Sequence, residues 1–238
     1  MEKETSNLGE LESQKEKLIT KYKAKGLFRI LHSEPVERAF RLLHRELFMP
    51  KGLESKAYNN HAYFLEHGST ISAPYMQITL AEALNLQEGQ RILEIGSGSG
   101  FQAALCASII APLESKIAGH VFTIERLSEI ADFAKKNIEA AGIENFVTVI
   151  CGDGSLGLPE HAPFDRILVT ASAKKVPSRL LQQLKIGGQL VIPLGHFRRF
   201  QSLVRFTKIS DQKIKKKTLK FFSVYFVRLV GAEGWAEK

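Results

Sequence analysis

A short apolar run that is broken by three glycines constrains the fold of this chain more than any other feature. The run 91–95 is followed by Gly96, and two more glycines stand at every second position after it, Gly98 and Gly100. Residues 101–110 then continue with apolar residues at helical spacing. A strand, a glycine turn and a helix in this order are typical of the first βα unit of a Rossmann-like sheet, where ligands lie at the carboxyl ends of the strands. Because glycine lacks a Cβ, it allows unusual backbone angles and the close approach of a ligand. This stretch therefore predicts a binding site.

The spacing of the glycines narrows the class of ligand. A dinucleotide fold has the pattern G-x-G-x-x-G, whereas Gly96-Ser-Gly-Ser-Gly100 has G-x-G-x-G and follows the acidic residue Glu94. This pattern resembles motif I of the S-adenosylmethionine-dependent methyltransferases. The next apolar run, 120–125, ends at Glu125, whose carboxylate can accept hydrogen bonds from a ribose diol. An ordinary glycine-rich turn without a ligand is the alternative interpretation.

Strands and helices alternate after this turn, which favours an α/β fold. Further strands are expected at 146–151, 164–171 and 189–193, and helices at 127–141 and 177–184. The alternation then stops, and 200–209 and 219–229 are expected to form two strands joined by a lysine-rich hairpin. The sequence therefore predicts a Rossmann-like, mostly parallel sheet with an antiparallel C-terminal hairpin and with N-terminal helices before it.

The length of 238 residues favours one α/β domain with an N-terminal extension over two domains. We expect a flexible terminus over residues 1–14 and a single domain over 15–238. Within this domain we expect a helical extension over 15–57, an active-site segment over 58–76 and a Rossmann-like core over 77–238.

The composition indicates a soluble protein of the cytoplasm. Hydrophobic residues make up 44% of the chain and charged residues 24%, which are ordinary globular values. No apolar stretch approaches the length of a membrane helix, and the first residues lack the layout of a signal peptide. Cys106 and Cys151 lie in apolar runs without metal-ligand spacing, so we expect reduced thiols and no metal site.

The net charge of +8 raises the question of an acidic partner such as nucleic acid. Much of the excess, however, lies in two local runs, 15–29 and 208–220, and such runs are more often solvated faces than binding grooves. We therefore expect neither a specific nucleic-acid partner nor a membrane partner, and we expect a monomer.

The segment 58–75 is irregular, is rich in aromatic residues, and lies directly before the predicted Rossmann-like unit. A segment of this length without periodicity is often functional. It contains Ser72, two residues before Pro74, and helical spacing follows from Met76. Local pattern alone favours a structural role, in which Ser72 caps the helix that begins near Pro74.

Five stretches together resemble one family, the protein-L-isoaspartate O-methyltransferases, over roughly residues 15–229. Their order and spacing match that family at 70–76 (TISAPYM), 93–100 (LEIGSGSG), 152–154 (GDG), 162–165 (APFD) and 184–193 (LKIGGQLVIP). Motif I is common to many methyltransferases, and the Thr-Ile-Ser-Ala-Pro stretch is the part that narrows the choice to this family.

The resemblance implies protein repair with S-adenosyl-L-methionine as the cofactor. The family transfers a methyl group to the free α-carboxyl of L-isoaspartyl residues in damaged proteins and peptides. Such a carboxylate is already ionised at neutral pH, so the reaction needs alignment and desolvation more than it needs a base. Ser72 matches the family's active-site serine, whose hydroxyl can hydrogen-bond the substrate carboxylate.

Four loops that follow predicted strands meet at one edge of a parallel sheet, and the resemblance places the cofactor there. The glycines are expected at the methionine part, Glu125 at the ribose and Asp153 or its neighbours at the adenine, although Asp153 alone is typical of a turn. The expected cofactor contacts are Thr70, Ile71, Gln77, Glu94, Gly96, Ser97, Gly98, Gly100, Glu125, Gly152, Asp153 and Thr170. The substrate is expected to contact Ser72, Val227 and Arg228.

The chain departs from the family pattern at two places, and two other functions remain open. Arg228 stands where the family usually has proline, and Lys174 and Lys175 make the stretch after the fourth strand more basic, which can favour acidic peptides. The enzymatic alternative is a methyltransferase of the same fold that acts on RNA or a small molecule; the charge supports it, but the chain has no Asn-Pro-Pro-Tyr-type tetrapeptide. The other alternative is a non-catalytic module that binds S-adenosylmethionine.

Overall fold

A computed structural model describes residues 2–26, 29–112, 115, 117, 119–196, 198–219 and 224–237, with side chains from residue 9 onward. Within these residues a seven-stranded sheet has the strand order β5-β4-β3-β6-β7-β8-β9. The strands are β3 (Arg91–Ile95), β4 (His120–Glu125), β5 (Val147–Cys151), β6 (Phe164–Val169), β7 (Leu184–Leu194), β8 (Ser202–Ser210) and β9 (Lys213–Thr218). The strands from β5 to β7 pair in parallel, and β7, β8 and β9 pair antiparallel. The mostly parallel sheet with an antiparallel end is confirmed.

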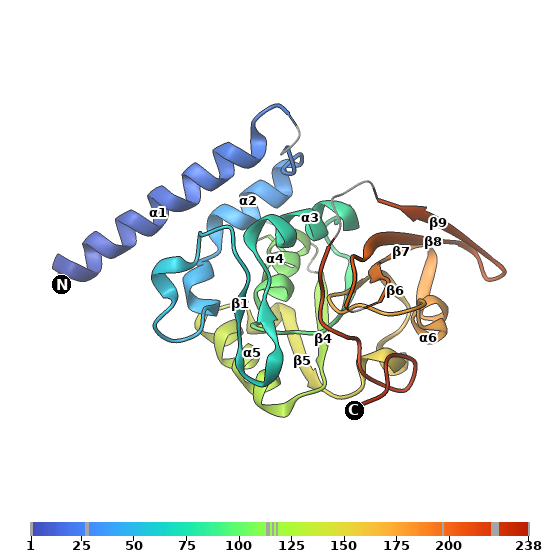
Figure 1. Ribbon diagram of the computed structural model, residues 1–238. Helices are drawn as coiled ribbons and strands as arrows, with labels where there is room; N and C mark the ends of the chain where they lie inside the picture. Colours follow the sequence, from blue (N-terminus) through green and yellow to red (C-terminus); the bar gives the residue numbers. More distant parts are fainter. Residues whose placement is uncertain are drawn as a thin grey trace.

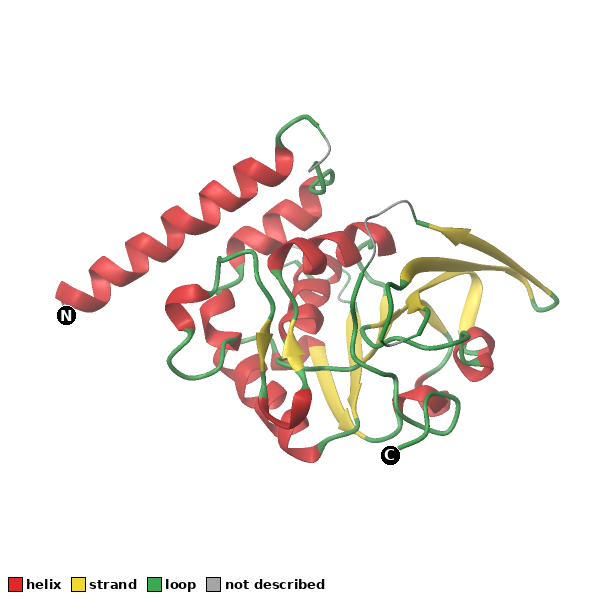
Figure 2. Ribbon diagram, in the orientation of Figure 1, coloured by secondary structure: helices red, strands yellow, loops and turns green. Residues whose placement is uncertain are grey.

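Helices cover both faces of the sheet, which explains why its central strands are apolar without alternation. On one face Ile92 and Leu168 pack into the larger hydrophobic cluster, together with α2 to α5. On the other face Leu93 and Ile167 pack into a second cluster, which includes Leu180 of α6. The helices are α1 (Glu2–Lys23), α2 (Glu34–Leu42), α3 (Pro74–Leu84), α4 (Phe101–Ile110), α5 (Ser128–Ala140) and α6 (Ser178–Gln182). Figures 1 and 2 show helices α1 and α2 on one side of the molecule and the twisted ribbon of β8 and β9 on the other.

Short elements fill the connections. A two-stranded antiparallel hairpin, β1 (Tyr63–Phe64) with β2 (Thr70–Ile71), precedes α3. Single turns of 3₁₀ helix lie at Arg45–Phe48, Glu54–Lys56, Glu66–Gly68, Glu144–Phe146, Gly154–Leu156 and Pro159–His161. The first three of these turns and the hairpin lie between α2 and α3.

Helix α1 begins at Glu2, within the stretch 1–14 whose flexibility stays a prediction. Leu11 on this helix is buried, and the buried ammonium of Lys15 donates to the carbonyl oxygen of Arg41 at 2.9 Å. These contacts join α1 to α2, while Figure 1 shows the first turns of α1 extending beyond the rest of the chain. The helix therefore starts before residue 15, where the helical extension is expected to begin, and its polar first turns gave no signal of this earlier start.

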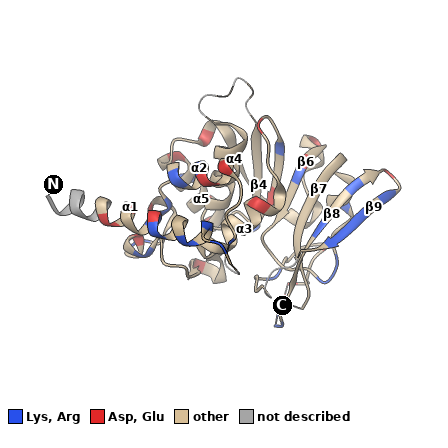
Figure 3. Cartoon of the chain, turned by 90° about the horizontal axis from the view of Figure 1, so that it is seen from above, with Lys and Arg blue, Asp and Glu red and all other residues tan. Residues whose placement is uncertain are grey.

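The last strand also differs from the expectation. The lysine-rich stretch, expected as the turn of a hairpin, is itself strand β9, and it pairs with β8 from Val204↔Thr218 to Ser210↔Lys213. All six residues of β9 are exposed, and Figure 3 shows the blue of Lys and Arg along β9 at the edge of the sheet. Charged side chains protect an edge strand from pairing with other chains. Of the expected strand 219–229, residues 220–223 lie outside the described residues, and 224–230 contains only isolated bridges.

Candidate active site

A cavity of about 990 Å³ opens at the carboxyl ends of β3, β4 and β6. The glycine loop, which we define as residues 96–100, contributes residues 96–99 to its wall, and the active-site segment contributes residues from Asn60 onward. The residues around Glu125 and Thr170 and the C-terminal segment, which we define as residues 224–230, complete it. This is the edge at which the sequence predicts a ligand.

The glycine loop has a backbone that side chains would obstruct. Gly96 and Gly98 have φ of 95° and 52°, in the left-handed region that favours glycine. A Cβ on Gly98 would lie 3.2 Å from the carbonyl oxygen of Thr70, and one on Gly96 would collide with the Thr170 hydroxyl. The loop therefore lies directly against the active-site segment. Gly100 differs, because its Cβ would meet Ala134 of α5 and it does not line the cavity.

Glu125 lines the cavity beside the glycine loop, as predicted. Its Oε2 accepts the Gly98 N–H at 3.2 Å, and its Oε1 accepts the N–H groups of Arg126 and Leu127. Because a carboxylate offers about four acceptor positions, one position on Oε2 is left for a ligand. Thr170, at the end of β6, also lines the cavity, and its hydroxyl donates to carbonyl oxygens of the β3 end.

Glu94 lies behind the loop and not in the wall of the cavity. It is 1% exposed, and the Thr123 hydroxyl donates to its Oε2 at 2.5 Å. The Ser97 hydroxyl, which does reach the cavity wall, lies 2.7 Å from that of Thr123. Burial raises the pKa of Glu94 to about 8; the hydrogen bond from Thr123 opposes this rise and the charge of Glu125 adds to it. At neutral pH this carboxyl is therefore protonated. It is linked to the glycine loop through the hydroxyl groups of Thr123 and Ser97.

Ser72 is half-buried in the cavity wall and does not cap α3. The N-cap residue is Ala73, which makes no side-chain capping bond. Among the described residues, the Ser72 hydroxyl has no hydrogen-bond partner. The capping role that local pattern favours is therefore wrong, and the hydroxyl is available to a ligand in the cavity.

Thr70, Ile71 and Gln77 also line the cavity, on the side of the active-site segment. Gln77 is buried on α3, and its side-chain oxygen accepts a hydrogen bond from the guanidinium of Arg45. Sequence reasoning missed Arg45, because it lies in a short polar and apolar mixture, residues 44–48, without a recognisable pattern.

The adenine contact expected at Asp153 or its neighbours stays a prediction. Asp153 does not line the cavity, since its Oδ1 accepts from Ser155 and its Oδ2 accepts the Ala232 N–H at 2.7 Å. Partial burial raises the pKa of Asp153, but the hydrogen bonds from Ala232 and Ser155 outweigh it and hold the pKa below its ordinary value. Gly152 is outside the wall as well, whereas Gly154 is in it.

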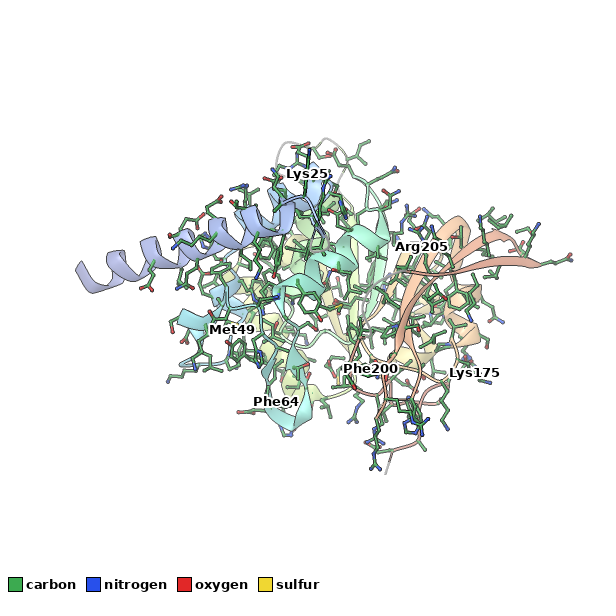
Figure 4. All side chains as sticks on the ribbon, turned by 45° about the horizontal axis from the view of Figure 1, so that its top comes forward. Lys25, Met49, Phe64, Lys175, Phe200 and Arg205 are labelled. Atoms are coloured by element: carbon green, nitrogen blue, oxygen red, sulfur yellow. The ribbon has the colours of Figure 1, made fainter. Side chains whose placement is uncertain are left out.

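Val227 and Arg228 line the opposite side of the cavity, in the C-terminal segment. The Ser172 N–H donates to the Val227 carbonyl oxygen at 2.7 Å, and Ser172 bridges to Arg228 in parallel. Two exposed aromatic rings also line the cavity. Phe64, labelled in Figure 4, is 81% exposed on the β1–β2 hairpin, and Tyr225 of the C-terminal segment is 63% exposed. All three expected substrate residues thus face one cavity.

The residues present fit S-adenosyl-L-methionine. The cavity is large enough, the glycine loop leaves a bare backbone surface, and Glu125 keeps an acceptor position. Among the described residues, no group of three or more His, Cys, Asp or Glu side chains could hold a metal ion. In that same part of the chain, no helix combines the length and the apolar character needed to cross a membrane.

Comparisons with known proteins agree with this site. The family model described as protein-L-isoaspartate(D-aspartate) O-methyltransferase matches residues 13–234. The protein-L-isoaspartate O-methyltransferase of Hyperthermus butylicus is 46% identical over 209 residues, which are 87% of this chain and 86% of that protein.

Two solved structures are similar as well. A protein-L-isoaspartate O-methyltransferase has a TM-score of 0.78 at 31% identity; the match covers 92% of this chain and 66% of that chain, so this chain spans about two thirds of its length. The putative enzyme of Plasmodium falciparum, in complex with S-adenosyl-L-homocysteine, has a TM-score of 0.76 at 28% identity and coverages of 89% and 95%. The resemblance found in the motifs is confirmed: this chain belongs to the protein-L-isoaspartate(D-aspartate) O-methyltransferase family.

Proposed function

We propose that this chain transfers a methyl group from S-adenosyl-L-methionine to the free α-carboxyl of L-isoaspartyl residues in damaged proteins, and so serves their repair. Membership of the family supports the reaction, and so do relatives that carry the enzyme's name over nearly the whole chain. The bound S-adenosyl-L-homocysteine of the Plasmodium relative supports the cofactor. Transfer to RNA or a small molecule, and binding without catalysis, have no comparable support.

The cofactor supplies an electrophilic methyl group when it is bound. Gly98 lets the loop lie close to the active-site segment, because a Cβ at this position would lie 3.2 Å from the Thr70 carbonyl oxygen. A cofactor can then contact bare backbone at Gly98. Glu125 offers the acceptor position on Oε2 to a ribose hydroxyl. Because Arg45 occupies the side-chain oxygen of Gln77, the amide nitrogen of Gln77 is the group that can donate to an anionic ligand. The adenine contact at Asp153 stays a prediction, with Gly154 the residue of that loop in the cavity wall.

Ser72 holds the substrate carboxylate in this proposal. Its hydroxyl lies in the same cavity as the glycine loop and has no hydrogen bond to any residue that the structure describes, and this observation carries the assignment. An α-carboxylate is ionised at neutral pH, so no base has to remove a proton. The hydroxyl would donate a hydrogen bond that fixes the orientation of the carboxylate, while Val227 and Arg228 bind the peptide on the other side.

Ser72→Ala tests the role of the hydroxyl. If Ser72 aligns the carboxylate, kcat/KM for an isoaspartyl peptide falls by a factor of ten or more, because each ~1.4 kcal/mol lost from the transition state is tenfold. The melting temperature stays close to that of the wild type, because Ser72 caps no helix. Unchanged turnover together with a lower melting temperature would leave Ser72 a structural residue. Calorimetry with S-adenosyl-L-homocysteine should give nearly unchanged affinity.

The proposal also covers the substrates, the oligomeric state and the cellular location of the chain. Family membership supports isoaspartyl-containing proteins and peptides as substrates. We propose in addition that the chain is a monomer of the cytoplasm without a specific nucleic-acid partner. Light scattering checks the first point. For the last, an RNA complex at physiological salt that is lost when Lys215, Lys216 and Lys217 become glutamine would contradict the proposal, whereas weak binding that salt removes would not.

A further inference from the structure

Arg45 is a fully buried cation that joins three parts of the active site. It lies in the 3₁₀ turn Arg45–Phe48, and its side chain is 0% exposed. Its Nη2 donates to the carbonyl oxygen of Ser72 at 2.9 Å, and its Nη1 donates to the side-chain oxygen of Gln77. Its Nε donates to the carbonyl oxygen of Ala57 at 2.7 Å.

The guanidinium also touches the helix that follows the glycine loop. Its Cζ lies 5.0 Å from the ring centroid of Phe101, the first residue of α4, in a cation–π contact. One side chain from the N-terminal extension therefore contacts the active-site segment at Ser72, helix α3 at Gln77 and the start of α4.

This cation has no carboxylate partner among the described residues. Its acceptors are two backbone carbonyls and one amide, and the nearby Glu46 bonds the Tyr58 hydroxyl. Burial lowers the pKa of Arg45 to about 9, and the neighbouring tyrosines oppose this fall, so the group stays charged at pH 7. A buried charge without a counter-ion is unfavourable for stability, and a neutral side chain could fill the same space. The presence of an arginine at this buried position therefore points to a role in the site.

We propose that Arg45 is a positioning residue for methyl transfer, which acts by fixing the backbone of Ser72. This inference rests on the proposed role of Ser72. The planar fork of the guanidinium reaches three acceptors in fixed directions, which a lysine ammonium cannot reproduce. Because the Ser72 hydroxyl has no hydrogen bond within the described part of the chain, its place in the cavity depends on this backbone bond.

Arg45→Lys tests the proposal in the whole chain, with Lys15→Met as the matched control. Lys15 is also a buried cation of the N-terminal extension, and its ammonium donates to the carbonyl oxygen of Arg41 at 2.9 Å, but it does not line the cavity. Both variants should lower the melting temperature. Only Arg45→Lys should lower kcat for an isoaspartyl peptide, by a factor of ten or more, while Lys15→Met stays within about twofold of the wild type.

A double-substitution cycle separates positioning from structural support. If Arg45 acts through Ser72, Arg45→Lys lowers kcat less than threefold in a Ser72→Ala background, because there is no hydroxyl left to position. A full tenfold loss in that background, or a kcat of Arg45→Lys near that of the wild type, would overturn the proposal. Arg45→Gln enters the same cycle if the lysine variant fails to fold. Wild-type methylation of the isoaspartyl peptide in each experiment keeps a failure of this inference distinct from a failure of the proposed function.

Discussion

The two sides of the cavity are assembled in different ways. On the cofactor side, parallel pairing alone brings the strand ends together, because Ile95 lies beside Ile124 of β4 and Val169 of β6. On the substrate side, segments distant in sequence meet through a few hydrogen bonds, several of them from side chains to backbone groups. Gln201 holds Phe226 of the C-terminal segment, and Arg45 holds Ser72.

This difference has a mechanistic consequence. The cofactor side is fixed by the ladder of the sheet, so the positions of the strand ends do not depend on any one side-chain hydrogen bond. The substrate side depends on side chains that bind backbone groups, and each such bond can be removed by one substitution. Changes in the two regions should therefore separate the affinity for the cofactor from the turnover of the peptide.

Gly98→Val should have the largest effect and abolish the binding of S-adenosyl-L-homocysteine in calorimetry. The φ of 52° disfavours a β-branched residue, and its Cβ would lie 3.2 Å from the Thr70 carbonyl oxygen. Gly142→Val is the matched control, because Gly142 also has a positive φ, 68°, but no atom within 4 Å of its Cβ position. Retained affinity in a folded Gly98→Val variant would contradict the cofactor assignment.

Gln201→Ala should raise the KM for the isoaspartyl peptide by about 3- to 10-fold and leave the affinity for the cofactor unchanged. The Gln201 side chain accepts the Phe226 N–H at 2.8 Å and donates to the Phe226 carbonyl oxygen at 3.2 Å. Losing two such bonds, at about 1 kcal/mol each, loosens the segment that carries Val227 and Arg228.

Gln183→Ala is the control for this variant, because it removes a similar pair of bonds elsewhere. The Gln183 side chain accepts the Leu158 N–H and donates to the Leu156 carbonyl oxygen. Both variants should melt at lower temperature, and only Gln201→Ala should change the KM for the peptide. An equal KM in the two variants would mean that the C-terminal segment does not bind substrate.

Glu94→Gln should have the smallest effect, a gain in stability that appears as the pH rises. With a pKa of about 8 the folded chain keeps the proton that the unfolded chain loses near its ordinary value of 4.5. The free energy of unfolding of the wild type therefore falls between these two pH values, and glutamine has no proton to lose. We expect the melting temperature of Glu94→Gln relative to the wild type to increase by about 2 °C or more from pH 5 to pH 8. Glu139→Gln, at an exposed position on α5, should show no such trend.

The cofactor side could be predicted from the sequence because its signals are local. The glycines and Glu125 directly follow apolar strands, and a parallel sheet brings the ends of such strands to one edge. Family membership confirms the cofactor, and the order of the sheet confirms that these strand ends share one edge, while the individual contacts stay predictions. Ser72 was found by resemblance, because its local pattern alone indicated a cap that the structure does not have.

The rest could not be predicted because it depends on contacts between distant residues or on context. The Asp153 carboxylate accepts a hydrogen bond from the N–H of Ala232, which lies 79 positions later in the sequence. Arg45 gains its partners only when the extension folds against α3, and no spacing reveals this. Strand β9 was read as a turn because its lysines obscure it, although an edge strand with exposed faces tolerates them.

The most direct test of the account is methyl transfer by the wild-type chain to an isoaspartyl peptide, with its normal aspartyl twin as the control. A radiolabelled methyl group on S-adenosyl-L-methionine makes the product measurable as a base-labile ester. The account predicts methylation of the isoaspartyl peptide and none above background of its twin. Equal methylation of the two peptides, or of neither while the cofactor is bound, would contradict it.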